Sequence, residues 1–309
     1  MIAADAVSVV IVTHDSSAVV GRALASVAEV GEIVVVDNAS ADDTAAFVAG
    51  AAPRARILRL PTNTGFAFAC NAGLGAATKP YVLFLNPDAA LEPGALAALL
   101  EAAERYPNAA LIGPSILRPD GGIEPSHDLG LFARIAAGAR RDTAEPPAGD
   151  LSAEFLSGAV FLGRVAALRA VGGFDPDFFL YFEDDDLCWR LRQAGWTLVR
   201  AAAARARHAG GASAPPSAAR ERLKRLSFGW SRLHFEAKHR DEIALNRAAL
   251  RLILRHLARA LGNALLFRAA RRDRNLWTAL GMVARFRGVC ARAAIGLTRP
   301  DGTLKSAAT

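Results

Sequence analysis

The 309-residue sequence predicts an α/β protein with a Rossmann-like, mostly parallel sheet, helices on both faces of that sheet, and a helical, basic C-terminal region. The first observation is the regular alternation of apolar runs and helix-like segments over residues 1–113. These runs are nearly continuous, as in strands that are buried on both faces. The second is charge: residues 1–214 carry 17 basic and 24 acidic side chains, whereas residues 215–309 carry 20 and 6. The two parts are therefore expected to have different surroundings or tasks.

The individual elements follow from the local pattern. Five strands are expected at residues 8–13, 32–37, 56–60, 81–86 and 110–113, with helices between them. Residues 114–154 are rich in Pro, Gly and charge and predict a long, partly ordered loop at the edge of a site. FLSGAVFLG then predicts a strand, RVAALRAV a short helix, and EDDDLCWRLRQAGW a helix that starts with acids and ends at a glycine. We expect a domain over 1–214, with halves 1–113 (nucleotide-binding) and 114–214, before the helical region 215–309.

The composition excludes several classes of protein. With 52% hydrophobic and 22% charged residues, the chain is globular rather than disordered. Its first fifteen residues have no basic segment, and their apolar run is too short for a signal peptide or a span, which favours a cytoplasmic protein. Cys70, Cys188 and Cys290 are far apart and are expected to be buried free thiols. The stretch T-H-D-S-S-A after the first strand lacks the G-x-G-x-x-G of a dinucleotide-binding oxidoreductase.

Polar residues follow each of the first four strands at its carboxyl end. They are Thr13, His14 and Asp15, then Asp37 and Asn38, then Asn63, Thr64 and Gly65, and finally Asn86, Pro87 and Asp88. Each group alone is typical of a turn or a helix cap. Because the carboxyl ends of parallel strands meet at one edge of a sheet, four such groups predict a ligand site at that edge.

Seven stretches occur together in a fixed order: VSVVIVTHD, IVVVDNASADDT, NTGFAFACNAG, YVLFLNPDA, FLSGAVFLGR, GGFDPDFFLYFEDDDLCWRLRQAGW and HAGGAS. Together they resemble the family 2 glycosyltransferases with the A-type nucleotide-sugar transferase fold, and more narrowly their rhamnosyltransferase-like branch. The resemblance covers residues 7–213, two thirds of the chain. It has three departures: His14-Asp15 stands where Tyr-Asn is usual, Cys70 stands where a Gly is usual in the glycine loop, and Asn86 replaces the first Asp of D-x-D.

The resemblance implies transfer of a sugar, with inversion, from a nucleoside diphosphate to an acceptor hydroxyl. Asp37 would accept from the imide N–H of a pyrimidine, because an ionised carboxylate is acceptor-only. The other residues implied at the nucleotide are Thr13, Asp15, Asn38, Asn63, Gly65, Asn71 and Asn86. Asp88 would hold Mg²⁺ or Mn²⁺ beside the leaving diphosphate, with His208 as the second protein ligand.

The acidic run of residues 183–186 supplies the base that the reaction requires. The family's E-D motif aligns best with Glu183 and Asp184, so Asp184 would take the proton from the acceptor and Glu183 would contact acceptor or donor sugar. Asp185 and Asp186 stay open as alternatives for the base. Gly158 and Trp189 are expected near the acceptor or donor sugar.

The basic tail has a pattern of its own. Arg247, Arg251, Arg255 and Arg259 recur at i+4 and form one stripe on a helix, flanked by Leu250, Leu252, Ile253, Leu254, Leu257 and Leu261. Such a helix either lies on an anionic membrane surface or packs on the catalytic domain with its arginines in solvent. Nucleic acid is not expected as a partner, because the arginines lack interleaved aromatic residues.

The leading hypothesis is a metal-dependent transferase that moves rhamnose from dTDP-rhamnose to a polysaccharide or lipid-linked glycan. One alternative keeps the class and changes the donor, for example to a UDP-hexose. A sugar nucleotidyltransferase would need a Gly-rich, basic loop after the first strand, which THDSSAVV does not provide. A non-catalytic carbohydrate-binding protein would be indicated by loss of Asp88 or of the E-D acids, and both are present.

Overall fold

The computed structural model describes residues 2–124, 126–128, 130–131, 148–211, 216–240 and 242–295, with side chains from 249 onward in the last range. The chain forms two compact units. The sheet unit comprises Met1–Thr64, Phe68–Asp175 and Asp184–Pro215. The helical unit comprises Gly65–Ala67, Pro176–Glu183 and Pro216–Thr309. Residues 176–183 thus belong to the helical unit although the chain on either side of them belongs to the sheet unit.

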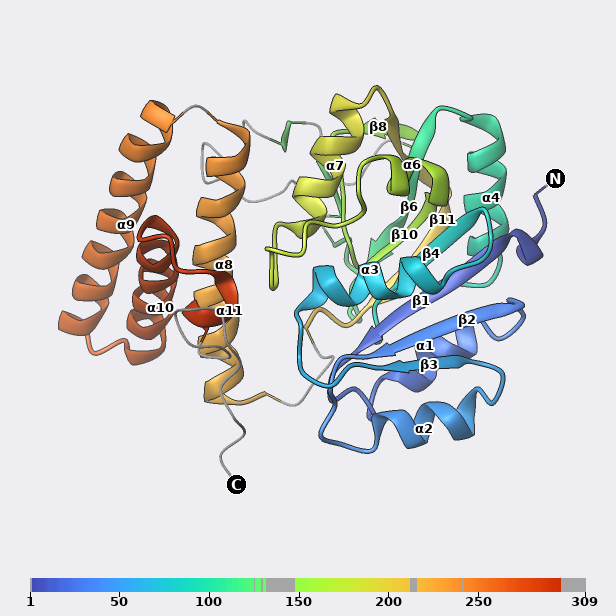
Figure 1. The fold of residues 1–309 in the computed structure, drawn as a ribbon, viewed down its shortest axis with the longest axis horizontal. Helices are drawn as coiled ribbons and strands as arrows, with labels where there is room; N and C mark the ends of the chain where they lie inside the picture. Colours follow the sequence, from blue (N-terminus) through green and yellow to red (C-terminus); the bar gives the residue numbers. More distant parts are fainter. Residues whose placement is uncertain are drawn as a thin grey trace. The chain divides into compact units, whose positions relative to one another are not determined.

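The sheet unit is built on a nine-stranded mixed sheet (Figure 1), whose strand order is β3-β2-β1-β4-β10-β6-β11-β5, with β8 paired to β11. Its strands are β1 (Val7–Thr13), β2 (Glu32–Asp37), β3 (Arg56–Arg59), β4 (Tyr81–Leu85), β5 (Ala89–Leu91), β6 (Ala109–Leu117), β8 (Leu151–Ala153), β10 (Val160–Arg164) and β11 (Thr197–His208). Two short strands, β7 (His127–Asp128) and β9 (Phe155–Leu156), pair separately.

The predicted α/β class is confirmed, with one difference in strand order. Strands β1 to β4 are parallel to one another, as the apolar runs predict. The expected fifth strand, β6, does not follow β4 in the sheet, because β10 lies between them and is antiparallel to both. FLSGAVFLG forms two strands, β9 and β10, separated by residues 157–159, rather than one. Within 114–154, the described residues extend β6 to Leu117 and form β8, and the remainder of that expected loop lies partly outside the described residues.

Both faces of the sheet are buried because each strand sends alternate side chains to opposite faces. On one face, Val9 and Ile11 of β1 join side chains of α1 (Val20–Ser26), α2 (Thr44–Ala51) and α4 (Ala95–Arg105) in the main core. On the other face, Val10 packs directly against Gly73 of α3 (Phe66–Ala76), which crosses in front of the sheet in Figure 1. The remaining helices of this unit are η1 (Ala4–Ala6, a 3-10 helix), α6 (Val165–Ala170) and α7 (Glu183–Gln193).

The cysteine prediction is correct for two residues and wrong for the third. Cys70 and Cys188 are buried free thiols, whereas Cys290 is exposed. Cys70 lies inside α3 and faces the core, so the expected glycine loop is confined to the residues before Phe66. The local sequence did not show this, because a helical run of small residues and a glycine-rich loop have similar compositions.

The helical unit contains α8 (Ala218–His239), α9 (Glu242–Leu265), α10 (Ala269–Phe286) and α11 (Ala291–Ala294). Ser217 caps α8, since its hydroxyl accepts the backbone N–H of Arg220. Helices α8 and α10 approach closely at two glycines: a Cβ at Gly229 would lie 2.0 Å from the carbonyl oxygen of Thr278, and one at Gly281 would lie 2.1 Å from that of Leu226. Only glycine permits this backbone contact.

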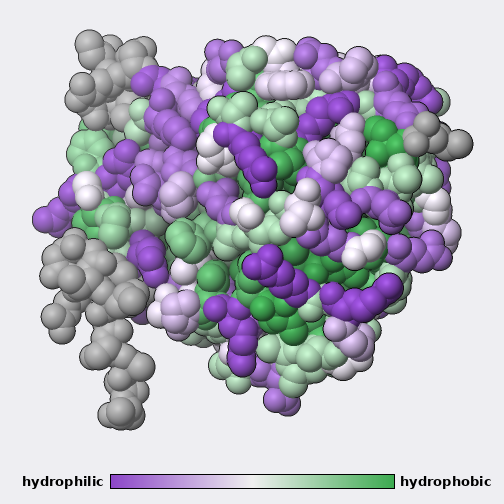
Figure 2. Space-filling view, turned by 45° about the vertical axis from the view of Figure 1, so that its right-hand side comes forward, coloured by the Kyte–Doolittle hydropathy of each residue, from purple (hydrophilic) through white to green (hydrophobic). Residues whose placement is uncertain are grey.

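Among the described residues, none of the helices combines the length and the apolar character that crossing a bilayer requires. On the face shown in Figure 2, hydrophobic side chains reach the surface between hydrophilic ones.

Candidate active site

The last two strands of the sheet bring Asp88 and His208 together. Asp88 ends the N-P-D turn after β4, and β5 starts at the next residue. Because β5 pairs antiparallel with β11, Ala89 lies opposite His208. The Asp88 carbonyl accepts the N–H of Ala209 over 3.0 Å, and Oδ1 of Asp88 lies 3.3 Å from Nε2 of His208. The sheet therefore places side by side the two residues that the sequence predicts as metal ligands.

His208 is held between two carboxylates. Its Nδ1 lies 2.7 Å from Oε2 of Glu124, and the side chains of Asp88 and His208 are 0% and 10% exposed. Burial by itself lowers the pKa of His208, but the hydrogen bonds and charges of Asp88 and Glu124 outweigh burial and raise the pKa to about 9. Glu124 is absent from the sequence predictions, because it falls in the 114–154 region and no motif surrounds it.

The chemistry of Asp88 and His208 fits a divalent cation. Asp88 offers a carboxylate oxygen and His208 offers the facing imidazole nitrogen Nε2, a donor pair that suits Mn²⁺ and, through its oxygen, Mg²⁺. Glu124 faces the other ring nitrogen, Nδ1, so it orients the ring and does not face the same position. A cation bound by the ring would replace the proton of His208, since only neutral imidazole is a ligand.

Asp184 lies at the same edge of the sheet. Its Oδ2 accepts the backbone N–H of Gly158 over 2.9 Å, and its Oδ1 accepts that of Asp185 over 3.0 Å. Gly158 precedes β10, and the neighbouring carbonyl of Ala159 accepts the N–H of Asn86 over 2.9 Å. The backbone from Gly158 to Ala159 thus links Asp184 to the N-P-D turn.

The structure separates the acids of the run 183–186 from one another. Asp186 is 0% exposed at its side chain and forms an ion pair of 2.7 Å with Arg190. Asp185 and Glu183 are also buried, whereas Asp184 is half-buried. Asp184 is therefore the most accessible of the four, and Asp186 has a partner that supports the fold of α7.

The predicted nucleotide residues at the ends of β1 to β3 form one hydrogen-bonded group. Asp37 is 1% exposed, accepts the N–H of Ser40 over 3.1 Å and lies 3.4 Å from Nε of Arg59. Asn38 holds the loop after β3, because its Oδ1 accepts the N–H of Thr64 over 2.8 Å and its Nδ2 donates to Asn63 over 3.1 Å. Two of the four polar groups that the sequence predicts at this edge are therefore directly connected.

Thr13, His14 and Asp15 belong to the same group. Thr13 is buried, and its hydroxyl donates to the carbonyl of Val36 over 3.4 Å. Nδ1 of His14 lies 3.0 Å from the carbonyl oxygen of Asn38. Asp15 has a left-handed backbone (φ 52°), and its carboxylate accepts the N–H of Ala41 over 2.7 Å. Asp15 thus binds the loop after β2 in addition to any role at the nucleotide.

Two of three other predicted residues, Asn71 and Gly65, have close structural contacts in the described part of the chain. Asn71 clamps the backbone of Phe174: its Nδ2 donates to the carbonyl over 2.7 Å and its Oδ1 accepts the N–H over 2.8 Å. Gly65 has φ 89°, and a Cβ there would lie 2.6 Å from the carbonyl oxygen of Phe179. Trp189 is half-buried in α7. Ligand contacts of these three residues stay predictions.

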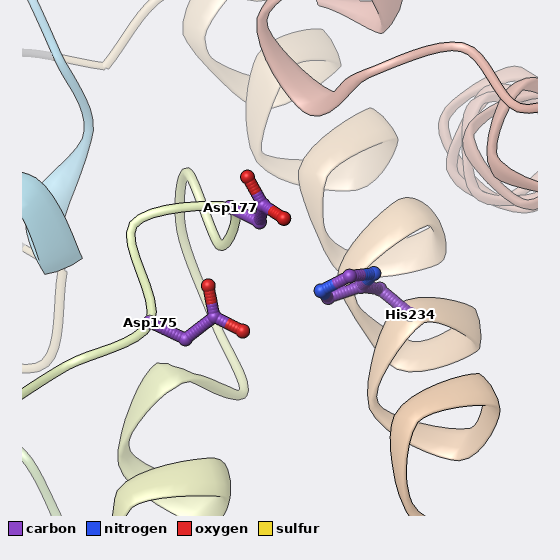
Figure 3. Close-up of side chains that lie close together, drawn as sticks. All are labelled: Asp175, Asp177 and His234. Carbon is purple, nitrogen blue, oxygen red and sulfur yellow. The ribbon is translucent and has the colours of Figure 1, made fainter. Parts of the chain in front are cut away.

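The helical unit contains a second pair of potential metal ligands. Asp177 and His234 have ligand atoms within 4.8 Å of each other, and Figure 3 shows their side chains together with Asp175. Nε of Arg285 donates to Nδ1 of His234 over 3.0 Å. Because arginine only donates, Nδ1 is the accepting nitrogen, and the neutral ring carries its proton on Nε2. The ring therefore offers no lone pair to a cation while this hydrogen bond is made.

Comparison with known proteins finds relatives of this chain. Residues 8–172 match the glycosyl transferase family 2. An N-acetylglucosaminyl-diphospho-decaprenol L-rhamnosyltransferase of Mycobacterium tuberculosis is 33% identical over 235 residues, which cover 66% of this chain and 76% of the relative. A pre-mycofactocin glycosyltransferase of the same organism is 32% identical over 61% of this chain and 39% of the relative. A mannosyltransferase from Pyrobaculum calidifontis, solved with GDP-Man and Mn²⁺, has a TM-score of 0.57 at 17% identity and covers 91% of this chain and 86% of its own.

The A-type fold and these relatives define a glycosyltransferase that uses nucleotide sugars. The chain belongs to glycosyl transferase family 2.

Proposed function

We propose that the protein is an inverting, metal-assisted glycosyltransferase that moves rhamnose from dTDP-rhamnose to a hydroxyl of a lipid-linked or polysaccharide glycan. The observation that carries the proposal is the shared edge of the sheet, where Asp37, Asp88 and Asp184 all lie at or beside strand ends. The 33% identical relative is named for rhamnosyl transfer to a diphospho-decaprenol acceptor, which supports both the sugar and the acceptor class.

The nucleotide would bind over the connected loops after β1, β2 and β3. Asp37 is held in place by Ser40 and Arg59, so an acceptor oxygen is fixed for the imide N–H of thymine. Asn38 and Asn63 would face the ribose or the phosphates. Because hydrogen bonds among the loops already hold these side chains, nucleotide binding would order few of them, and its entropic cost would be small.

The leaving diphosphate would depart beside Asp88. Asp88 and His208 would hold Mg²⁺ or Mn²⁺, with Glu124 orienting the His208 ring from its other nitrogen, and a bound cation supplies charge that offsets the charge developing on the diphosphate. The protein's own contribution is the pairing of β5 with β11, which fixes Asp88 and His208 before any ligand binds.

Asp184 would act as the general base. Its carboxylate takes the proton of the acceptor hydroxyl, and the oxygen attacks the anomeric carbon from the face opposite the diphosphate. The bond from that carbon to the diphosphate breaks, and its electron pair leaves with the diphosphate, so the configuration is inverted. The N–H groups of Gly158 and Asp185 orient the carboxylate for this transfer.

The test is a panel of donors with a short-chain N-acetylglucosaminyl-diphospho-prenol as acceptor. We expect release of dTDP from dTDP-rhamnose in Mn²⁺ and none in EDTA, with an inverted linkage in the product by NMR. Transfer from a UDP-hexose instead would show that the proposed donor is wrong and that the protein is still a glycosyltransferase. Absence of release from every donor would contradict the proposal.

We further propose that α9 places the enzyme on an anionic membrane surface, where a lipid-linked acceptor resides. Five leucines of α9 are exposed by 38–72% and share one face: Leu250, Leu254, Leu257, Leu261 and Leu265. Arg251, Arg255 and Arg259 are exposed as well, whereas Ala249, Ile253 and Ala260 are buried; the side chain of Arg247, the first arginine of the predicted stripe, lies outside the described residues. The helix thus has one apolar face inside its unit and a second, exposed one beside arginines, as interfacial helices have.

Replacing Arg251, Arg255 and Arg259 together by Gln is expected to reduce sedimentation with phosphatidylserine vesicles at low salt. Each arginine near such a surface contributes about 1 kcal/mol, and added salt screens the attraction. Gln leaves the helix propensity nearly unchanged. The matched control replaces Arg22, Arg54 and Arg56, exposed arginines of the sheet unit, by Gln. Equal sedimentation of both triple variants would refute the membrane role of α9.

A further inference from the structure

The segment 176–183 carries the aromatic run Phe178-Phe179-Leu180-Tyr181-Phe182 and is packed by the helical unit. Its last residue, Glu183, starts α7, so Asp184 is the second residue of that helix. The conformation of this segment therefore sets where α7 begins and where its acids are presented. The helices of the C-terminal region, which the proposed chemistry does not use, hold this segment in place.

The backbone of the segment is strained just before the acids. Tyr181 has φ 70° and Phe182 has φ 66°. Two consecutive residues with side chains in the left-handed region are unfavourable, because Cβ crowds the following carbonyl. Such a conformation persists only where surrounding contacts impose it, and strain of this kind concentrates at functional sites.

Helix α8 supplies those contacts. The ring of Phe228 lies 5.8 Å from that of Tyr181 and 5.4 Å from that of Phe182. The ring of Phe235 also lies 5.8 Å from that of Phe182. The hydroxyl of Ser231, which is fully buried, donates to the carbonyl of Leu180 over 3.0 Å. One helix thus fixes three successive residues, through both side chains and backbone.

The start of the segment is joined to the loop after β3. The carbonyl of Phe179 accepts the N–H of Phe66 over 2.8 Å, and Gly65 leaves room for the backbone of Phe179. At the other end, burial raises the pKa of Tyr181 to about 12; the charge of Glu183 adds to this rise and the charge of Arg225 opposes it. The segment thus connects an expected nucleotide loop to the acid pair.

We propose that α8 is a positioning element for the transfer reaction: Phe228 and Ser231 hold the left-handed turn at Tyr181 and Phe182, and this turn presents Glu183 and Asp184. The proposal rests on the proposed function for the role of the acids. Phe228 and Ser231 are positioning residues, since they contact the turn and not the reacting atoms. Their loss would misplace the acids while Asp37, Asn38 and Asn63 keep their positions, because hydrogen bonds within the sheet unit hold these three residues.

The test is Phe228→Ala, with Phe286→Ala as the matched control. Phe286 is the same residue type on α10 and is 56% exposed. Phe228→Ala is expected to lower kcat about 10-fold while the KM for the donor changes less than 2-fold, since misplacement of a catalytic group costs rate rather than binding. Phe228→Leu, which keeps an apolar side chain, should recover most of the rate. Hydrogen exchange followed by mass spectrometry should show faster exchange of amides 180–185 in Phe228→Ala.

Unchanged exchange at 180–185, or an equal loss of kcat in Phe286→Ala, would overturn the proposal. A rise in the donor KM that accounts for the loss of activity would overturn it too, because it would indicate a distorted nucleotide site. If Phe228→Ala is too unstable to purify, Ser231→Ala gives the same readouts with only a hydroxyl removed. The hydrogen-exchange measurement needs no turnover. It therefore tests whether α8 holds the turn at Tyr181 and Phe182 even if the donor panel contradicts the proposed function.

Discussion

Asp184→Asn is expected to lower the rate of sugar transfer by about 10² to 10⁴-fold, the usual effect of removing a general base. The amide oxygen of Asn can still accept the N–H of Gly158, the contact that ties this side chain to the strand edge, and only the bond from the N–H of Asp185 is lost, so most of the local structure should be kept. The loss should therefore fall on kcat, with donor binding nearly unchanged. Single-turnover transfer with radiolabelled donor, together with the donor Kd from calorimetry, measures the two effects separately.

The neighbouring acids provide the controls. Asp186→Asn weakens the buried ion pair with Arg190, so it should lower Tm, and its rate per folded molecule should stay close to that of the wild type. Asp185→Asn is the decisive comparison, because Asp185 was left open as the base by the sequence. If Asp185→Asn loses the rate and Asp184→Asn keeps it, the assignment of Asp184 is wrong.

Asp88→Ala is expected to lower the rate of Mn²⁺-dependent dTDP release by about 100-fold or more. This loss exceeds the one expected for a residue that only orients a metal ligand, because Asp88 is proposed to bind the metal directly. Mn²⁺ affinity, measured by electron paramagnetic resonance, should fall in parallel. The sequence alone suggests that this substitution leaves the fold untouched. The structure changes that expectation, since the Asp88 side chain is fully buried against His208 and its loss leaves His208 with Glu124 alone.

Two variants separate the chemistry from the packing. Asp88→Asn keeps the shape and removes the charge, so it should lose metal affinity with a smaller drop in Tm than Asp88→Ala. Asp120→Ala removes an exposed aspartate of the same unit and should leave both activity and Mn²⁺ affinity unchanged. Full Mn²⁺ affinity in Asp88→Asn would exclude the Asp88 carboxylate as a ligand.

The sequence by itself determined the elements whose signal is local. The apolar runs identify β1 to β4, and helical patterning identifies the segments between them, because burial on both faces of a sheet is visible in each strand separately. Parallel strands joined by helices bring their carboxyl ends to one edge, so the connection of Asp37, Asn38 and Asn63 could be anticipated from the order of the motifs. The acidic start of α7 could also be predicted, because the acids and the helical pattern that follows them are adjacent in the sequence.

Only the tertiary structure decided which distant segments are neighbours. The antiparallel insertion of β10 between β4 and β6, the pairing of β5 with β11 that brings His208 to Asp88, and the arrival of Glu124 beside them depend on hydrogen bonds between strands far apart in the chain. Local periodicity carries no information on such pairing, because any strand edge presents the same N–H and C=O groups. The distinction between Asp184 and Asp186, and the packing of Phe182 on α8, likewise arise from burial that only the assembled fold creates.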